Sequence, residues 1–286
     1  MKVSVLFPVQ EKMGPRREQL RDFVLDGYRN AFPDWQILEG LGPMGAFWNK
    51  GDAIANAFAN ATGDALIIAD ADSFVDDWAL EESVRRLEEF PWVVPHGQVY
   101  RLNENATNQV IAGGKIRWHA LERATYEGPA GGGIVVMRRE AYEAVNGIDP
   151  RFVGWGGEDI SFAMALELLT GPHSRVGSPL VHLQHPRPNV KNRGSFANEA
   201  LVAAYQSALD SGDVDGMKAL CAREAPADWL PPLDPPARFQ TLTGRRKRIR
   251  IQNAEFIFGD EGILETVDPY LAKQLRRRTV LCKELS

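Results

Sequence analysis

The chain has 286 residues, of which 44% are hydrophobic and 25% are charged, as is usual for a globular protein. Its net charge of −5 provides no overall field that would draw the chain to nucleic acid or to an anionic membrane. The two cysteines, Cys221 and Cys282, show no metal-binding spacing and are too few for a disulfide framework. We expect a reducing, cytoplasmic setting and, without a long apolar stretch, no signal peptide and no membrane span.

The first 70 residues alternate between predicted strands and predicted helices. Strands are expected at Val3–Phe7, Trp35–Leu38 and Ala65–Ala69, and helices at Arg16–Asn30 and Asn49–Ala61. The run Ala65–Ala69 is continuously apolar, which is typical of a strand that is covered on both faces. This order predicts an α/β fold with a mostly parallel, Rossmann-like sheet flanked by helices, in which ligands bind at the carboxyl ends of the strands.

The rest of the chain continues the pattern and then changes. Helices are expected at Asp77–Glu89, Arg139–Val145, Asp159–Leu169, Asn198–Asp210 and Val214–Arg223, strands at Val93–Val94, Gln98–Leu102, Ile134–Met137 and Val181–Leu183, and a polar loop at Asn103–Gln109. We predict a main domain at 1–190, a helical extension with a proline-rich linker at 191–235, and a small C-terminal α+β module at 236–286, containing a strand pair and a helix.

An acidic pair follows the third predicted strand. Asp70 and Asp72 are two residues apart, so both carboxylates can reach one hard cation such as Mg²⁺ or Mn²⁺. Acidic pairs of this spacing are also common in solvated turns. The position directly after a buried strand, at the ligand-binding edge of the sheet, favours the metal site.

A glycine-rich hexapeptide, Gly154-Trp155-Gly156-Gly157-Glu158-Asp159, precedes a predicted helix. Its glycines permit a close backbone approach, and Trp155 offers a flat apolar face on which a sugar ring can pack. Asp159 can cap the helix, and an ionised carboxylate beside an acceptor hydroxyl is a candidate general base. The competing interpretation is that Asp159 is only a cap and Trp155 only a core residue.

Two histidines, His182 and His185, follow the last predicted strand of the main domain. A histidine there could supply a third metal ligand, although a single histidine is more often structural. One helix and one turn separate them from Asp159, which makes their return to the same sheet edge plausible. We favour His182 as the ligand, with His185 as the second choice.

Residues 1 to about 190 resemble glycosyltransferases of the GT-A fold. The stretch Gly131–Met137, followed by Gly147–Asp149 and Gly154–Asp159, is similar to the C-terminal half of animal beta-1,4-galactosyltransferases. It also resembles polypeptide N-acetylgalactosaminyltransferases and bacterial chondroitin-type polymerases. The resemblance implies metal-dependent transfer, with Mn²⁺ or Mg²⁺, of a hexose or N-acetylhexosamine from a UDP-sugar. The acceptor would be a hydroxyl of a glycan, a protein or a modified nucleobase.

The resemblance also implies residue roles. It implies that Asp70, Asp72 and His182 bind the metal and that Asp159 is the base, with Glu158 beside it. The acceptor would be bound by Trp155, Gly156 and Gly157. The donor would be bound by Pro8, Val9, Gln10, Lys50, Asn56, Asp70, Gly132 and Gly133. Lys50 fits a solvated helix start equally well. The retaining relatives usually carry Asn where this chain has Asp159, which favours an inverting reaction.

A basic run, Arg245 to Arg250, is prominent in an otherwise acidic chain. It could contact nucleic acid or another anionic partner, but we favour an edge strand that is protected by its charges. The following segment, Phe256–Pro269, resembles small modules of tailed-phage structural proteins. This resemblance implies a phage-encoded enzyme in the host cytoplasm that acts on a virion protein or on modified DNA.

Two other functions compete with glycosyl transfer. A nucleotidyltransferase would need a glycine-rich basic loop after the first strand, whereas Gln10–Arg17 contains a single glycine. A catalytically inactive GT-A-like module that binds sugars or nucleotides in a virion or surface assembly is the second alternative. The intact metal and base positions argue against it.

Overall fold

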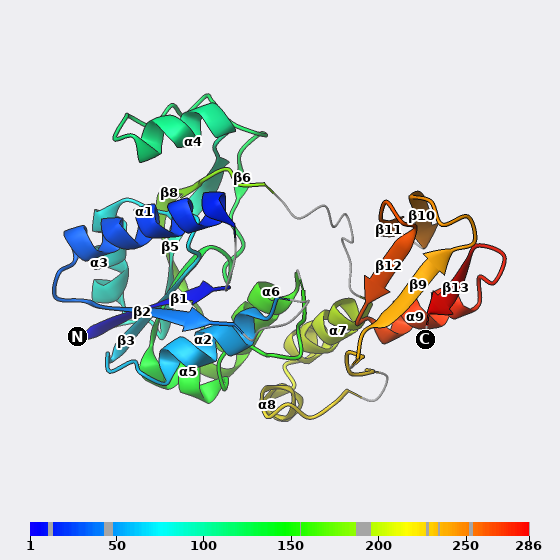
Figure 1. The fold of residues 1–286 in the computed structure, drawn as a ribbon. Helices are drawn as coiled ribbons and strands as arrows, with labels where there is room; N and C mark the ends of the chain where they lie inside the picture. Colours follow the sequence, from blue (N-terminus) through cyan, green and yellow to red (C-terminus); the bar gives the residue numbers. More distant parts are fainter. Residues whose placement is uncertain are drawn as a thin grey trace.

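The computed structural model describes residues 1–10, 14–42, 48–154, 156–186, 196–226, 229–233, 235–251 and 254–285. It consists of a layered α/β domain and a smaller β-rich module beside it, with helix α7 between the two (Figure 1).

A central sheet organises the large domain. Its strands are β1 (Val3–Val9), β2 (Gln36–Leu41), β3 (Ala65–Ala69), β4 (Ser73–Phe74), β5 (Trp92–Arg101), β6 (Tyr126–Glu127), β7 (Ile134–Arg138) and β8 (Ser174–His182). They lie in the order β2-β1-β3-β7-β5-β8-β4, with β6 paired to β5. The α/β class is as predicted.

The sheet is mixed, whereas the sequence predicted a mostly parallel one. β1 is parallel to β2 and β3, and β5 is parallel to β8, but β7 is antiparallel to both of its neighbours. β4 and β6 are antiparallel additions. The segment between β5 and β7 stays at the edge of the sheet where β5 ends. The chain therefore enters β7 from that edge, and β7 runs antiparallel to β5. No crossover helix first returns the chain to the opposite edge.

Helices cover both faces of the sheet. They are α1 (Pro15–Ala31), α2 (Lys50–Phe58), α3 (Asp77–Arg86), α4 (Glu104–Ile111), α5 (Arg139–Ala144), α6 (Glu158–Thr170), α7 (Phe196–Ser211) and α8 (Val214–Cys221). One apolar cluster joins the sheet to α1, α3 and α4, and a second joins it to α2 and to α5 through α8. None of the described helices combines the length and apolar character that a membrane crossing requires.

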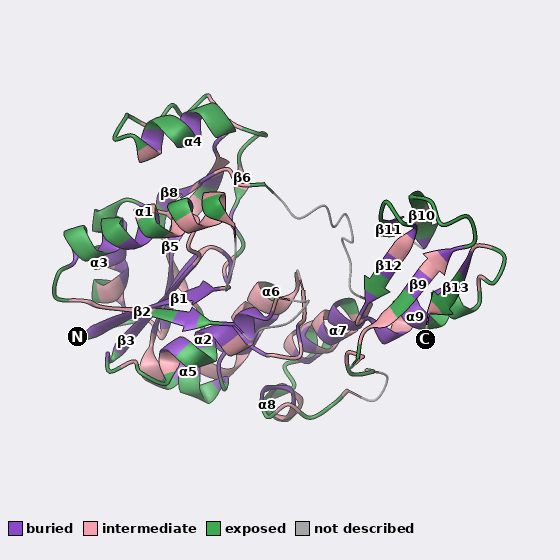
Figure 2. Ribbon diagram, viewed as in Figure 1, coloured by how far each residue is buried: buried purple, intermediate pink, exposed green. Residues whose placement is uncertain are grey.

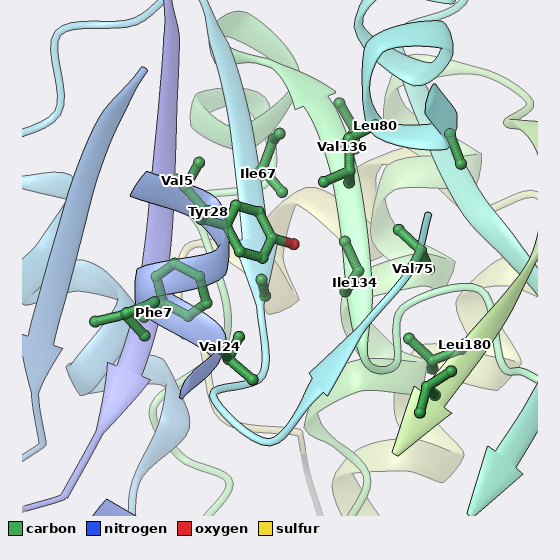
Figure 3. Close-up of a cluster of buried hydrophobic side chains, with 14 of the residues drawn as sticks. Val5, Phe7, Val24, Tyr28, Ile67, Val75, Leu80, Ile134, Val136 and Leu180 are labelled. Carbon is green, nitrogen blue, oxygen red and sulfur yellow. The ribbon is translucent and has the colours of Figure 1, made fainter. Parts of the chain in front are cut away.

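The alternation of side chains along β3 builds both clusters at once. Ala65, Ile67 and Ala69 face the first cluster, whereas Leu66 and Ile68 face the second. The first cluster is drawn in Figure 3, where strand residues meet α1 side chains such as Tyr28. The inner strands β1, β3 and β7 are buried along nearly all of their length, and the outer faces of the helices are exposed (Figure 2). The sheet is therefore a rigid support for residues at its edges.

Several predicted elements differ from the structure. The segment Asn103–Gln109, predicted to be a loop, is largely helix α4, because the Asn103 side chain caps it by accepting from the Ala106 amide, 3.0 Å away. The two strands predicted at Val93–Val94 and Gln98–Leu102 form one irregular strand, β5, whose pairing with β8 shifts register.

The C-terminal module has its own core. It contains β9 (Ala237–Thr241), β10 (Lys247–Ile251), β11 (Ala254–Phe258), β12 (Ile263–Thr266), α9 (Pro269–Arg276) and β13 (Cys282–Leu285). The described strands form two small sheets, β10-β11 and β12-β9-β13, so the predicted single strand pair is wrong. Asp268 joins the module to α7: it caps α9 and also accepts a hydrogen bond from the Phe196 amide. The domain boundaries stay predictions.

Candidate active site

The end of β3 and the end of β8 meet at one edge of the sheet. The Asp70 amide donates to the Gly133 carbonyl, 2.8 Å away, and the chain then turns through Asp72 into β4. β4 pairs with β8 so that Ser73 lies opposite His182. This register brings the residue before Ser73, Asp72, beside the imidazole of His182.

Three potential metal ligands gather at this edge. Nε2 of His185 lies 3.1 Å from Oδ2 of Asp72, and Nε2 of His182 lies 3.8 Å from Oδ1. One ligand atom from each residue lies within 4.8 Å of the other two. The Leu183 amide donates to the Asp72 backbone carbonyl over 2.9 Å, which holds the backbone of Asp72 against the end of β8. We call this group the Asp–His–His triad.

The protonation states of Asp72 and His182 suit a metal. Burial would raise the pKa of Asp72, but His182, His185 and Arg17 together hold that pKa below its usual range. Burial lowers the pKa of His182, against the opposing effect of Asp72. At neutral pH the site therefore offers a carboxylate and a neutral imidazole, the forms that bind divalent cations.

Asp70 belongs to a second group, which is centred on Lys50. The Lys50 ammonium lies 2.8 Å from Oδ1 of Asp70 and 2.7 Å from Oδ1 of Asp159, and the lysine side chain is 7% exposed. Asp70 is not among the described residues that form the triad. The interpretation of Lys50 as a solvated helix start is wrong, because Asn49 caps α2 and turns Lys50 inward.

Asp159 lies in the first turn of α6. The helix begins at Glu158 after Gly157, so Asp159 is not the helix cap that the sequence suggested. Burial raises the pKa of Asp159 to about 7, Lys50 opposes this shift, and Glu158 and Asp70 add to it. Burial disfavours the charge of Lys50, but Asp159 and Asp70 keep the lysine pKa well above its usual value. Asp159 can thus exchange a proton near neutral pH while Lys50 stays charged.

Three glycines allow β7 to start against α6. A Cβ on Gly131 would lie 1.9 Å from the Asp159 carbonyl oxygen in α6, and one on Gly132 would lie 2.8 Å from Cγ of Pro129. Gly133 has a φ of +75°. His96, which the sequence analysis missed, holds this segment through Nε2, 2.8 Å from the Gly132 carbonyl. Burial lowers the pKa of His96 to about 4, so it is neutral.

The glycine-rich loop before α6 is held by α7. Gly156 and Gly157 have φ angles of +98° and +100°, while Trp155 lies outside the described residues. Asn198 on α7 is buried, and its amide donates to the carbonyls of Gly156 and Val153 over 2.9 and 3.2 Å. Sequence reasoning missed Asn198, because a single polar residue in a helix carries no signal that it reaches a distant loop.

The remaining predicted donor residues lie at the ends of β1 and β2. Pro8 and Val9 are buried within β1, not after it, and Gln10 follows the strand. Asn56 on α2 is exposed and donates its amide to the Leu41 carbonyl, 2.7 Å away. Their binding roles stay predictions.

The loop contact allows a first test. We expect Asn198→Ala to leave two loop carbonyls without this donor, which lowers stability by about 1–3 kcal/mol. Displacement of Gly156 and the adjoining turn of α6 should lower the rate of the glycosyl transfer expected from the sequence by about 10- to 100-fold, with affinity for the expected UDP donor unchanged. Thermal melting, turnover and UDP titration measure these effects. Gln206→Ala, which removes a surface hydrogen bond from the same helix, is the control. Equal losses in the two variants would contradict a positioning role for Asn198.

Two family models match the part of the chain that builds this edge. The glycosyl transferase family 2 model matches residues 46–145, which include Lys50, Asp70 and Asp72. The model described as the N-terminal domain of galactosyltransferase matches residues 119–186, which include Asp159 and both triad histidines. Both models describe glycosyltransferases, and together their matches span residues 46–186 of the chain. A comparison with curated proteins gave no match.

The solved structures to which this chain is similar include two glycosyltransferases, both at low sequence identity. The catalytic domain of Drosophila beta-1,4-galactosyltransferase 7, in complex with xylobiose, is 16% identical, with a TM-score of 0.42, over 90% of this chain and 91% of that one. Glucosyl-3-phosphoglycerate synthase from Mycobacterium tuberculosis, in complex with Mn²⁺, UDP-glucose and phosphoglyceric acid, is 13% identical, with a TM-score of 0.45, over 95% and 91%.

Proposed function

We propose that this glycosyltransferase moves a hexose or N-acetylhexosamine from a UDP-sugar to an acceptor hydroxyl, with a divalent metal and with inversion at the anomeric carbon. The observation that carries the proposal is the meeting of two groups near one end of β3. The Asp–His–His triad offers metal ligands, and the Lys50 group offers a cation and a base. The match to a galactosyltransferase family model supports a nucleotide-sugar donor.

The donor set fits a divalent metal. Asp72, His182 and His185 would hold it, and Mn²⁺ fits two imidazoles and a carboxylate better than Mg²⁺, which prefers oxygen ligands. When bound, the ion would stabilise the negative charge that develops on the leaving diphosphate. Asp70 extends toward Lys50, so we assign it to donor binding.

The Lys50 group would handle the proton and the charge. Asp159 would take the proton from the acceptor hydroxyl, and its raised pKa suits that task near neutral pH. Lys50 would hold the carboxylates of Asp70 and Asp159 in place and offer positive charge to the diphosphate. Glu158, Gly156 and Gly157, with Trp155, are proposed to bind the sugars. A base beside the acceptor favours direct displacement, and hence inversion.

The metal preference is a direct test of this proposal. After treatment with EDTA, we expect release of UDP from UDP-galactose, UDP-glucose or their N-acetylated forms to require added metal. Mn²⁺ should support a rate about tenfold or more above Mg²⁺, because the triad supplies two nitrogen ligands. UDP-sugars are chosen because they occur in the complexes of two similar structures. Full activity without metal, or a preference for Mg²⁺, would contradict the assigned donor set. Absence of turnover with every donor would favour the binding-module alternative.

A further inference from the structure

Charge is divided very unevenly between the two parts of the chain. Residues 236–286 contain 11 lysines and arginines and 6 acidic residues, whereas residues 1–235 contain 22 basic and 32 acidic residues. The small module is therefore net positive by 5 and the rest is net negative by 10. Eight of the 11 basic residues of the module are arginines. The net charge of the whole protein conceals this division.

The basic charge is concentrated on one exposed strand and the turn before it. We call the side chains of Arg245, Arg246, Lys247, Arg248 and Arg250 the basic strand; all five are exposed. The alternation with isoleucine explains this, because Ile251 is buried and Ile249 is partly buried in the module core. The arginines between and before them must face outward.

Acidic neighbours neutralise little of this charge. Arg246 lies 3.7 Å from Asp260, which is 92% exposed, and Arg248 lies 3.3 Å from Glu255. Such exposed pairs contribute little and leave the arginines available. In the described part of the chain, Arg245, Lys247 and Arg250 form no ion pair.

Protection of an edge explains part of the run and not all of it. β10 is an edge strand that pairs with β11, and charged side chains on such a strand discourage edge pairing. Five basic side chains in six residues, in a protein that is otherwise acidic, exceed that need. A surface that serves solubility alone usually mixes positively and negatively charged side chains.

We propose that the basic strand docks the phosphodiester backbone of a nucleic acid. Each strand of a duplex carries about one charge per 3.4 Å, which is close to the rise of about 3.3 Å per residue along a β-strand in which nearly every residue is basic. Four of the five side chains are arginines, whose planar guanidinium groups bind phosphate oxygens in pairs. The described residues of the module show no row of exposed aromatic rings on which bases could stack. The proposed contact is therefore to the phosphate backbone and is independent of base sequence.

The docking surface is connected to the proposed active site. Asp268 of the module accepts a hydrogen bond from the amide of Phe196, the first residue of α7. Asn198, two residues later, holds the glycine-rich loop before α6. The module that carries the basic strand is therefore joined to the start of the helix that positions this loop. The docking itself does not depend on glycosyl transfer.

Binding of a fluorescent DNA duplex of mixed sequence to the full chain, followed by anisotropy, tests the proposal. With about three phosphate contacts, the affinity should fall about 40-fold between about 50 and about 200 mM NaCl. The double variant R246Q/R248Q should weaken binding and reduce the slope of log affinity against log salt by about two. EDTA in the buffer keeps the triad free of metal, so this result is independent of the proposed transfer reaction.

The matched control is R29Q/R85Q, which removes the same charge from the large domain. The exposed fractions of the side chains are comparable, 51% and 60% for Arg29 and Arg85 against 60% and 58% for Arg246 and Arg248. We expect the control to bind DNA like the parent. If R246Q/R248Q fails to fold, as judged by circular dichroism, R245Q/R250Q takes its place. No DNA binding, equal binding by both double variants, or tighter binding to chondroitin sulfate than to DNA would overturn the proposal.

Discussion

Asp72→Asn should abolish metal-stimulated release of UDP, with a loss of about 100-fold or more. Asp72 is the acidic member of the Asp–His–His triad, and its carboxylate contacts both imidazoles. Loss of residues that merely support metal ligands costs about 10- to 100-fold in affinity or activity, and a direct ligand should cost at least as much. Calorimetric titration with Mn²⁺ should show the same loss, because the neutral amide is a weaker ligand.

Asp64→Asn is the control for this experiment. Asp64 directly precedes β3 and so lies at the end of that strand opposite to Asp72, where its carboxylate accepts an exposed hydrogen bond from the Lys2 amide. This variant should bind Mn²⁺ and release UDP like the parent protein. Retention of Mn²⁺-dependent turnover by a folded Asp72→Asn protein would remove the triad from the reaction.

Asp159→Asn should reduce glycosyl transfer by about 10²- to 10⁴-fold, the usual contribution of a general base, with little change in UDP affinity. Burial raises the pKa of Asp159 to about 7, with Lys50 opposing the shift. Only the deprotonated carboxylate accepts a proton. The transfer rate should therefore rise about tenfold per pH unit below pH 7 and level off above it. The asparagine variant should lack this rise, and initial rates measured across pH check both effects.

The neighbouring carboxylate and the product supply the controls for this prediction. Glu158→Gln changes the same kind of group one residue earlier in α6. It should keep a pH-dependent rise in rate, with the rise moved to lower pH because Glu158 helps to raise the pKa of Asp159. NMR of the product should show the inverted anomer. A retained configuration, or an unchanged pH profile in Asp159→Asn, would exclude the base role.

The local patterns of the sequence predicted the first half of the fold well. The strand Ala65–Ala69 was predicted with the bounds that β3 has, because a continuous apolar run bounded by polar residues has few other solutions. Prediction was wrong where a local pattern was weak. The segment that begins at Asn103 is mostly polar, yet helix α4 has three buried residues. The direction of β7 depends on where the segment between β5 and β7 lies.

For the site, the sequence indicated the residues but not their grouping. Asp70 and Asp72 were predicted to share one metal, yet the structure turns Asp70 toward Lys50 and leaves Asp72 with two histidines. The reason is geometric, because the turn after β3 directs successive acidic side chains to different neighbours. His182 and His185 were weighed as alternatives, and both lie in the triad.

The sequence by itself determined the chemistry that is available: an acidic pair after a buried strand, a glycine-rich loop before a helix that begins with two carboxylates, and histidines after a late strand. These are local features, set by residue type and short spacing. The tertiary structure alone decided which of them meet. The pairing of Ser73 with His182, the inward turn of Lys50 and the reach of Asn198 to Gly156 join residues far apart in the chain. Such contacts depend on strand register and helix packing, which no short segment specifies.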